Sequence, residues 1–177
     1  VIAEDLGFLT DGVRRLVKDS GYPNMKVLQF AVDPADIACS NDYWPQNYSR
    51  NCVVYTGTHD NETLAGWYAG LSKDAKKQVR AYLYNTEIAD DQIYKALLNL
   101  AMTSVAKDCI IPVQDYLGLD NTCRMNQPGT VGFNWRWRLQ PKQLTAKLAK
   151  EVKAMTIQAN RANWDAIHAE EAAEEAE

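Results

Sequence analysis

The sequence predicts an α/β fold in which about four parallel strands alternate with helices that pack outside them. Short runs that are apolar at nearly every position alternate along the chain with segments that carry apolar residues at helical spacing, an order typical of a parallel sheet covered by helices. Because these runs lack the alternation of a half-exposed strand, we expect both of their faces to be buried. The expected strands are residues 1–3, 25–32, 52–56 and 109–113.

Four helices are expected between and after these strands, each with apolar residues three and four positions apart on one side. Their starts are predicted from side chains that cap helices, and in one case from a proline in the first turn. The predicted helices are one capped by Thr10 or Asp11 and ended by Gly21 and Pro23, one capped by Ser72, one capped by Asp90 or Asp91, and one that begins at Pro141. This alternation fits half of an eight-stranded barrel as well as an open doubly wound sheet.

Length and composition predict a folded globular unit with an acidic surface. The chain has 177 residues, of which 46% are hydrophobic and 24% charged, and its formal net charge is -4 with a pI near 5.2. This balance argues against nucleic-acid binding, which uses a basic surface. No apolar run approaches the roughly 20 residues of a membrane span, and the first residues lack the layout of a signal peptide. A cytoplasmic location without membrane contact is therefore expected.

The two ends of the chain lead to different expectations. Val1 opens directly into an apolar run, so we expect the chain to begin inside a domain and residues 1–161 to be part of one domain. Residues 162–177 are rich in alanine and glutamate. Such a composition is typical of an acidic helical tail that is frayed or disordered.

The cysteines are expected to be reduced thiols in the core. Cys39, Cys52, Cys109 and Cys123 are scattered, and none of them forms a C-x-x-C pair. A disulfide or a metal site would be the alternative. Outside the acidic tail there is one histidine, His59, which is too few for most zinc patterns. No metal or organic cofactor is therefore expected.

A first polar motif follows the first expected strand. Ile-Ala-Glu-Asp-Leu-Gly at residues 2–7 places a carboxylate at the end of a buried strand, followed by a glycine turn. In barrel enzymes that end of the strand carries catalytic groups. Because side chains alternate along a strand, Glu4 and Asp5 should point to opposite sides, and at most one can face a site. The alternative is an acidic turn that leads into the next helix.

A second motif follows the strand at residues 52–56. Gly-Thr-His-Asp-Asn at residues 57–61 concentrates polar and ionisable groups between an apolar strand and a helix. A purely structural role would make Asp60 or Asn61 the cap of that helix, a role that requires neither His59 nor Gly57. Both roles can coexist.

A third motif follows the last expected strand. Arg-Met-Asn-Gln-Pro-Gly-Thr at residues 124–130 leads to Asn-Trp-Arg-Trp-Arg at residues 134–138. Indole rings and amides in a loop at the mouth of a site suit carbohydrate, because a sugar packs its apolar face on a ring while its hydroxyls bind polar groups. Alternatively, Trp135 and Trp137 cover the end of the barrel.

Together, the motifs at residues 3–7, 57–61 and 125–130 and the Val-Leu-Gln-Phe run at residues 27–30 closely resemble the amylomaltase, or 4-alpha-glucanotransferase, family of the α-amylase clan. The resemblance covers residues 1 to about 157. It implies that the chain is the C-terminal half of a (β/α)8 TIM barrel, with about four parallel strands and outer helices. It also implies a retaining enzyme that transfers α-1,4-glucan segments between maltooligosaccharides in starch, glycogen or maltodextrin metabolism.

The resemblance assigns roles to residues of each motif. Glu4 would be the general acid/base, and Asp60 would hold sugar hydroxyls and stabilise the transition state. His59 would contact the same sugar ring. Gln46 stands where the family usually has a histidine before an Asn-Tyr pair. The other residues that would bind substrate are Asn61, Asn126, Pro128, Gly129, Trp44, Asn47 and Tyr48.

The nucleophile of a retaining reaction is expected to lie outside this chain. In the family an Arg-x-Asp motif on the strand before Val1 supplies it, and the sequence contains no such motif. Asp5 and Asp115 are not expected to replace it, because Asp5 should point away from Glu4 and Asp115 fits a structural group. The chain alone is therefore expected to be inactive, to need the missing N-terminal half of the barrel as a partner, and to self-associate through its open strand edges. The alternatives are an α-amylase-clan hydrolase and a non-catalytic glucan-binding half-barrel.

Overall fold

The computed structural model describes residues 1–174 of the chain. Its contacts divide the chain into two compact units, Val1–Arg138 and Leu139–Glu177. In the second unit, α6 (Ala146–Gln158) and α7 (Trp164–Glu174) are helices. The described part of the predicted acidic tail is thus largely helical, whereas Glu175 and Glu177 lie outside the described residues. A domain boundary at residue 161 stays a prediction.

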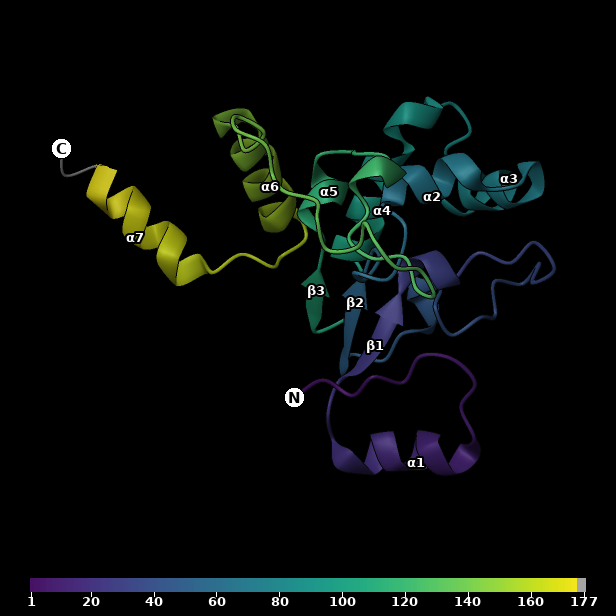
Figure 1. Ribbon diagram of the computed structural model, residues 1–177. Coiled ribbons are helices and arrows are strands. Elements are labelled where there is room, and N and C mark those ends of the chain that lie inside the picture. The colour runs from purple at the N-terminus through teal and green to yellow at the C-terminus, as the bar shows by residue number, and fades with distance from the viewer. Residues whose placement is uncertain (175–177) are drawn as a thin grey trace. The chain divides into compact units, whose positions relative to one another are not determined.

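Three parallel strands form the sheet of the first unit, in the order β1-β2-β3 (Figure 1). They are β1 (Asn24–Val27), β2 (Cys52–Tyr55) and β3 (Asp108–Ile110). The register pairs Val27 with Tyr55 and Tyr55 with Ile110, so the three strands end at the same edge. The prediction of an α/β fold with parallel strands is confirmed at this level.

Burial on both faces holds for the central strand only. The first three residues of β2 are buried, as predicted. In β3, by contrast, Asp108 and Ile110 are exposed. The predicted burial of β3 is therefore wrong, since no residue of this strand is buried.

The predicted first strand is reduced to one bridge. Ala3 pairs with Asn24 as an isolated parallel bridge, and its N–H donates to the carbonyl of Pro23 at 2.9 Å. Instead of a longer ladder, the carboxylate of Asp5 accepts the N–H of Met25 at 2.9 Å. The second strand is also shorter than predicted, since residues Leu28–Phe30 form a 3-10 turn.

Two of the predicted helices and caps are confirmed. Thr10 caps α1 (Asp11–Ser20), which ends at Gly21 in the left-handed conformation with φ 69°. Ser72 caps α3 (Lys73–Tyr82) through the N–H of Ala75. Both starts follow from local sequence, because a hydroxyl side chain at the cap accepts an N–H that the first turn leaves without a partner.

Two predicted helix starts are wrong. α4 (Ile93–Met102) has no side-chain cap and follows a 3-10 turn at Asp90–Gln92, and the carboxylate of Asp90 instead accepts from Arg80 at 2.5 Å. α6 begins at Ala146 with Thr145 as its cap, beyond Pro141. At the start of α4, the carboxylate of Asp90 is engaged by Arg80 and does not cap the helix. At the start of α6, Thr145 provides the cap, so the helix begins after Pro141.

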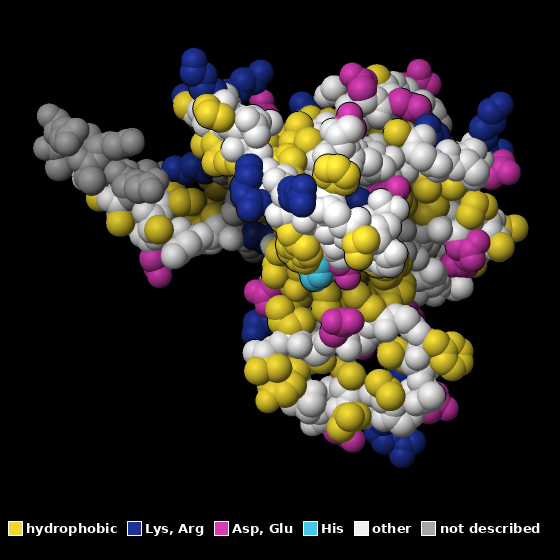
Figure 2. Space-filling model, in the orientation of Figure 1, with side chains coloured by type: hydrophobic (Ala, Val, Ile, Leu, Met, Phe, Trp, Pro, Cys, Tyr) yellow, Lys and Arg dark blue, Asp and Glu magenta, His cyan; other side chains and the backbone are white. Residues whose placement is uncertain are grey.

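The buried core of the first unit includes residues of the central strand and of the helices α2 (Leu64–Gly70) and α4. Leu64 and Tyr68 of α2 and Leu97 and Leu98 of α4 are buried. By contrast, no residue of α1 is buried, and its apolar side chains Val13 and Leu16 face solvent. In Figure 2 hydrophobic side chains gather over the strands, with acidic side chains and a histidine among them.

Candidate active site

Residues of the first and second motifs line one open pocket. Glu4, His59 and Asp60 lie around a cavity of about 350 Å³, together with Tyr55 of β2 and Ile110 of β3. Because Tyr55 and Ile110 are the last residues of paired parallel strands, the pocket lies at the carboxyl edge of the sheet. This is the edge at which α/β proteins place their ligand sites.

Glu4 and Asp5 occupy different surroundings. Glu4 is exposed and faces the pocket that contains Asp60. Asp5 is buried, and its two carboxylate oxygens accept from the side chain of Asn24 and the N–H of Met25, each at 2.9 Å. It lines a separate cavity of about 220 Å³. The two neighbouring carboxylates are therefore separated, as alternation along an extended segment requires.

The loop that carries His59 and Asp60 is fixed at its base by Asp115. The hydroxyl of Thr56, which follows β2, donates to Asp115 Oδ2 at 2.5 Å, and the N–H of Leu64, which starts α2, donates to Oδ1 at 2.7 Å. Asp115 lies in α5 (Val113–Tyr116) and is 1% exposed. Burial raises the pKa of this carboxyl above its usual range, although the two hydrogen bonds oppose the rise.

The helix after this loop does not use Asp60 or Asn61 as its cap. Thr63 caps α2, because its hydroxyl accepts from the N–H of Gly66 at 3.2 Å. Asn61 turns back instead, and its Oδ1 accepts from the N–H and the hydroxyl of Thr58, each at 2.8 Å. The structural alternative for Asp60 and Asn61 is therefore wrong, and the carboxylate of Asp60 is available to the pocket.

Gln29 contacts the same loop through a hydrogen bond to its backbone. Gln29 is buried, and its Nε2 donates to the carbonyl of Glu62 at 2.8 Å. A side chain at Gly57 would place its Cβ 2.6 Å from this Nε2. A side chain at this position would therefore have to displace the amide of Gln29. In the sequence, Gln29 stands out only as one polar residue inside an apolar run, and this pattern does not predict its hydrogen bond to Glu62.

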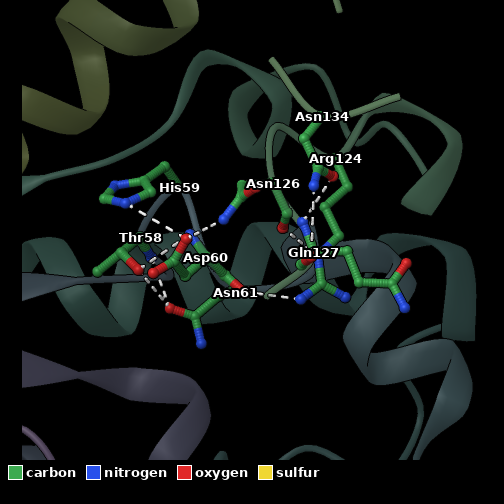
Figure 3. A network of polar contacts seen from close by, with 8 residues as sticks. All are labelled: Thr58, His59, Asp60, Asn61, Arg124, Asn126, Gln127 and Asn134. Carbon is green, nitrogen blue, oxygen red and sulfur yellow. Dashed lines mark hydrogen bonds and ion pairs between the residues drawn. The ribbon is translucent and has the colours of Figure 1, made fainter. Parts of the chain in front are cut away.

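Asp60 is held at one oxygen by two neighbours (Figure 3). Asn126 Nδ2 donates to Asp60 Oδ1 at 2.5 Å, and His59 Nε2 lies 3.3 Å from the same oxygen. The indole of Trp135 packs on the ring of His59 with centroids 5.0 Å apart and planes at 37°. Trp135 has a φ of 63° and donates its N–H to the carbonyl of Met125 at 2.6 Å. The second and third motifs therefore meet at Asp60.

The turn that follows Asn126 is exposed and internally bonded. Pro128 and Gly129 are exposed, and Gly129 has a φ of 76° that glycine adopts without strain. The turn is closed by Asn134, whose Oδ1 accepts from the N–H of Gln127 at 3.0 Å (Figure 3). Neither Pro128 nor Gly129 lines the pocket around Glu4, and their role in binding stays a prediction.

The remaining predicted residues lie apart from this pocket. Trp44 is 2% exposed and stacks on Tyr82 with ring centroids 4.1 Å apart. The hydroxyl of Tyr48 donates to the carbonyl of Tyr43, and Asn47 donates to the carbonyl of Cys39. These contacts give the three residues structural roles, and contact with substrate stays a prediction. Gln46 accepts from the hydroxyl of Tyr82.

The cysteines and the acidic groups form no further site. None of the four cysteines forms a disulfide, but only Cys52 is buried, so the predicted core location is wrong for Cys39, Cys109 and Cys123. Partial burial, together with the nearby Asp36 carboxylate, raises the pKa of the Cys39 thiol. Among the side chains that the structure describes, no group of three or more His, Cys, Asp or Glu could hold a metal. In the same part of the chain, no helix combines the length and hydrophobicity needed to cross a membrane.

The fold and the site define an α/β protein with a pocket of carboxylates and a histidine at the carboxyl ends of parallel strands. Sequence comparison makes this class more specific. The model of the 4-alpha-glucanotransferase family matches residues 1–145, and the chain belongs to this family. The membership predicted from the motifs is confirmed.

Individual relatives agree with this result. A 4-alpha-glucanotransferase of Synechocystis sp. is 44% identical over 157 residues, which are 88% of this chain and 30% of the relative. One of Streptococcus pneumoniae is 40% identical over 167 residues, 94% of this chain and 32% of the relative. This chain therefore spans about a third of the length of these relatives.

Solved structures match the same part. The structure of amylomaltase from Streptococcus agalactiae in complex with acarbose superposes with a TM-score of 0.85 at 33% identity, covering 92% of this chain and 32% of that one. An amylomaltase from Corynebacterium glutamicum superposes with a TM-score of 0.63 at 19% identity, which shows a shared fold. The three parallel strands and their helices thus correspond to part of an amylomaltase.

Proposed function

We propose that this chain supplies the acid/base part of a 4-alpha-glucanotransferase active site, which transfers α-1,4-glucan segments between maltooligosaccharides with retention. The observation that carries the proposal is that Glu4 and Asp60, from motifs far apart in the sequence, line one pocket at the carboxyl ends of the strands. Further support comes from the relative solved with acarbose. We also propose that the three strands and their helices are the C-terminal half of a (β/α)8 barrel.

Glu4 is the proton donor and acceptor in this proposal. It is exposed to the pocket, so a glycosidic oxygen can reach it. In a retaining transfer the acid protonates the leaving oxygen and, as a base, then takes a proton from the 4-hydroxyl of the incoming glucan. Asp5 cannot replace Glu4, because both of its oxygens are already bonded to Asn24 and Met25.

Asp60 supplies negative charge opposite the oxocarbenium-like transition state. Its described side-chain contacts, with Asn126 and His59, both use Oδ1. Oδ2 can therefore accept from sugar hydroxyls. An ionised group that is held in place before the reaction stabilises developing positive charge without first having to be reoriented.

The nucleophile comes from a region of the family that this chain does not cover. A retaining enzyme needs two carboxyl groups about 5–5.5 Å apart. Asp115 cannot act as one, since it is buried and both of its oxygens are bonded to Thr56 and Leu64. The chain covers 30% of the Synechocystis relative, so most of that relative remains to supply the missing group.

A chimera tests this function. The region of the Synechocystis 4-alpha-glucanotransferase that precedes the matched segment is joined to this chain, and the chimera is incubated with maltotriose. We expect glucose and longer maltodextrins as products. Glu4→Gln should lower turnover about 100-fold or more, because general acid/base catalysis contributes that much. Glu87→Gln is the matched control, since Glu87 is exposed and its carboxylate contacts Thr86. A folded chimera without disproportionation, or a Glu4→Gln variant above about a tenth of wild-type turnover, contradicts the proposal.

A further inference from the structure

The geometry points to Arg124 as a positioning residue that fixes the Asp60 carboxylate against the Asn126 amide, an assignment that rests on the function proposed above for Asp60. Arg124 follows the 3-10 turn Asn121–Cys123. It is not among the residues predicted to be catalytic or to bind substrate. It stands between the loop that carries Asp60 and the loop that carries Asn126 (Figure 3).

The guanidinium of Arg124 contacts both loops at once. Its Nη2 donates to the backbone carbonyl of Asp60 at 2.7 Å, and its Nε donates to the backbone carbonyl of Asn126 at 2.8 Å. Its Nη1 lies 3.9 Å from Glu62 Oε1, and the side chain is 21% exposed. A planar guanidinium presents five N–H donors in a fixed fork, whereas the single ammonium of lysine cannot reach three acceptors with this geometry.

These contacts determine where the Asn126 amide lies. The N–H of Asn126 donates to the carbonyl of His59 at 3.1 Å, so Arg124 and this hydrogen bond join the two loops at adjacent peptide groups. Neither residues 57–61 nor residues 125–134 contain a helix or strand that would fix their separation. With the loops joined, Asn126 Nδ2 is brought to 2.5 Å from Asp60 Oδ1.

Arg124 acts through position and not through its charge on substrate. Its contact with Asp60 is to the backbone carbonyl and not to the carboxylate. It lines a neighbouring cavity of about 190 Å³ with Glu62 and Met125, and it is not among the residues around Glu4. Loss of Arg124 should therefore misplace the Asp60 carboxylate, and small displacements of this kind cost about 100-fold in rate.

Hydrogen exchange of the 177-residue chain tests the clamp without requiring activity. In Arg124→Gln we expect the backbone N–H of Asn126 to exchange at least about tenfold faster than in the wild type, because local opening of the two loops is easier. The amides of Val53 and Val54 in β2 should exchange unchanged and so report that the fold is intact. Arg124→Lys should give a smaller acceleration. Arg14→Gln is the control, since Arg14 makes an exposed ion pair with Asp42 at 3.2 Å. Unchanged exchange at Asn126 in both Arg124 variants overturns the assignment.

A double-mutant cycle in the chimera tests the effect on catalysis. Arg124→Gln and Asn126→Ala should each lower kcat about 10- to 100-fold with KM within about threefold. Because both act through the position of one carboxylate, the double variant should be no more than about threefold slower than the slower single variant. Losses that multiply overturn the assignment, and so does wild-type turnover in Arg124→Gln when Asp60→Asn is inactive. Wild-type turnover in Asp60→Asn instead overturns the proposed function itself.

Discussion

Replacing Asp115 should release the loop that presents His59 and Asp60. The carboxylate joins the two ends of this loop, because it accepts from the hydroxyl of Thr56 and from the N–H of Leu64. Both donors are buried, and Asp115 itself is 1% exposed. Asp115→Ala removes the acceptor and leaves both donors without a partner.

The size of the effect follows from these two donors. A buried donor left without an acceptor costs about 1–3 kcal/mol, so two give about 2–6 kcal/mol. The variant no longer buries a charge, which offsets part of this loss. We therefore expect Asp115→Ala to lower the free energy of unfolding by about 2–4 kcal/mol. Asp115→Asn keeps an oxygen for Leu64 and a similar shape, and its loss should stay near about 1 kcal/mol.

The pH dependence of this difference has a definite sign. Burial raises the pKa of Asp115 in the folded state, so the folded chain binds this proton more tightly than the unfolded chain does. The stabilisation from Asp115 is therefore fully present below the unfolded pKa of about 3.9 and is lost as the pH rises through the folded pKa. Asn has no such titration. The stability advantage of the wild type over Asp115→Asn should thus shrink from pH 4 to pH 7.5.

Urea unfolding followed by circular dichroism measures these free energies at the two pH values. Asp42→Asn is the control, because Asp42 is exposed and pairs with Arg14 at the surface. An Asp115→Ala variant within about 1 kcal/mol of the wild type at both pH values refutes the assigned role of the two hydrogen bonds. An advantage over Asp115→Asn that grows as the pH rises refutes the direction of the pKa shift.

Three further predictions follow from the same structure. In the chimera, Asp60→Asn should lower kcat about 100-fold or more while oligosaccharide affinity by calorimetry changes less, because the lost charge acts mainly in the transition state. Gly66→Ala should lower the melting temperature of the chain, since its Cβ would overlap the side-chain amide of Asn121, whereas Gly70→Ala, with open space around its Cβ, should not. The chain alone should self-associate in size-exclusion chromatography with light scattering, because apolar side chains such as Phe8 and Leu16 are exposed. It should leave maltotriose unchanged because it lacks the nucleophile, and a monomer that makes glucose contradicts this prediction.

Local sequence signals predicted the parts of the fold that depend on neighbouring residues. The buried strand at Cys52–Tyr55 and the caps Thr10 and Ser72 were predicted because an apolar run and a hydroxyl at a helix start act within a few residues. The extent of the first strand was not predicted correctly. Its hydrogen-bond ladder is interrupted, because the carboxylate of Asp5 accepts the N–H of Met25. Sequence periodicity does not report such competition.

The same distinction applies to the site. Glu4, His59 and Asp60 were recognised because their motifs are contiguous in sequence, and they do share a pocket. Asp115 was expected to be a structural group, and its hydrogen bonds to Thr56 and Leu64 agree with this, but those partners were not predicted. Gln29 and Arg124 were not recognised as supporting residues. Apart from the carbonyl of Asn126, which is two positions from Arg124, the partners cited for these residues lie 33 to 64 positions away along the chain. Their roles therefore depend on tertiary contacts that no local pattern encodes.

Two residues hold the loop between β2 and α2, Asp115 at its base and Arg124 near Asp60. We expect one to determine stability and the other to determine kcat. At its base, Asp115 is buried, so its hydrogen bonds are shielded from water, which cannot replace a lost partner. At its tip, Arg124 is partly exposed, and water can replace its contacts at lower cost. Loss of Asp115 should therefore appear mainly in stability and loss of Arg124 mainly in kcat. Variants of Asp115 and Arg124 therefore distinguish the contacts that stabilise the loop from those that position the Asp60 carboxylate.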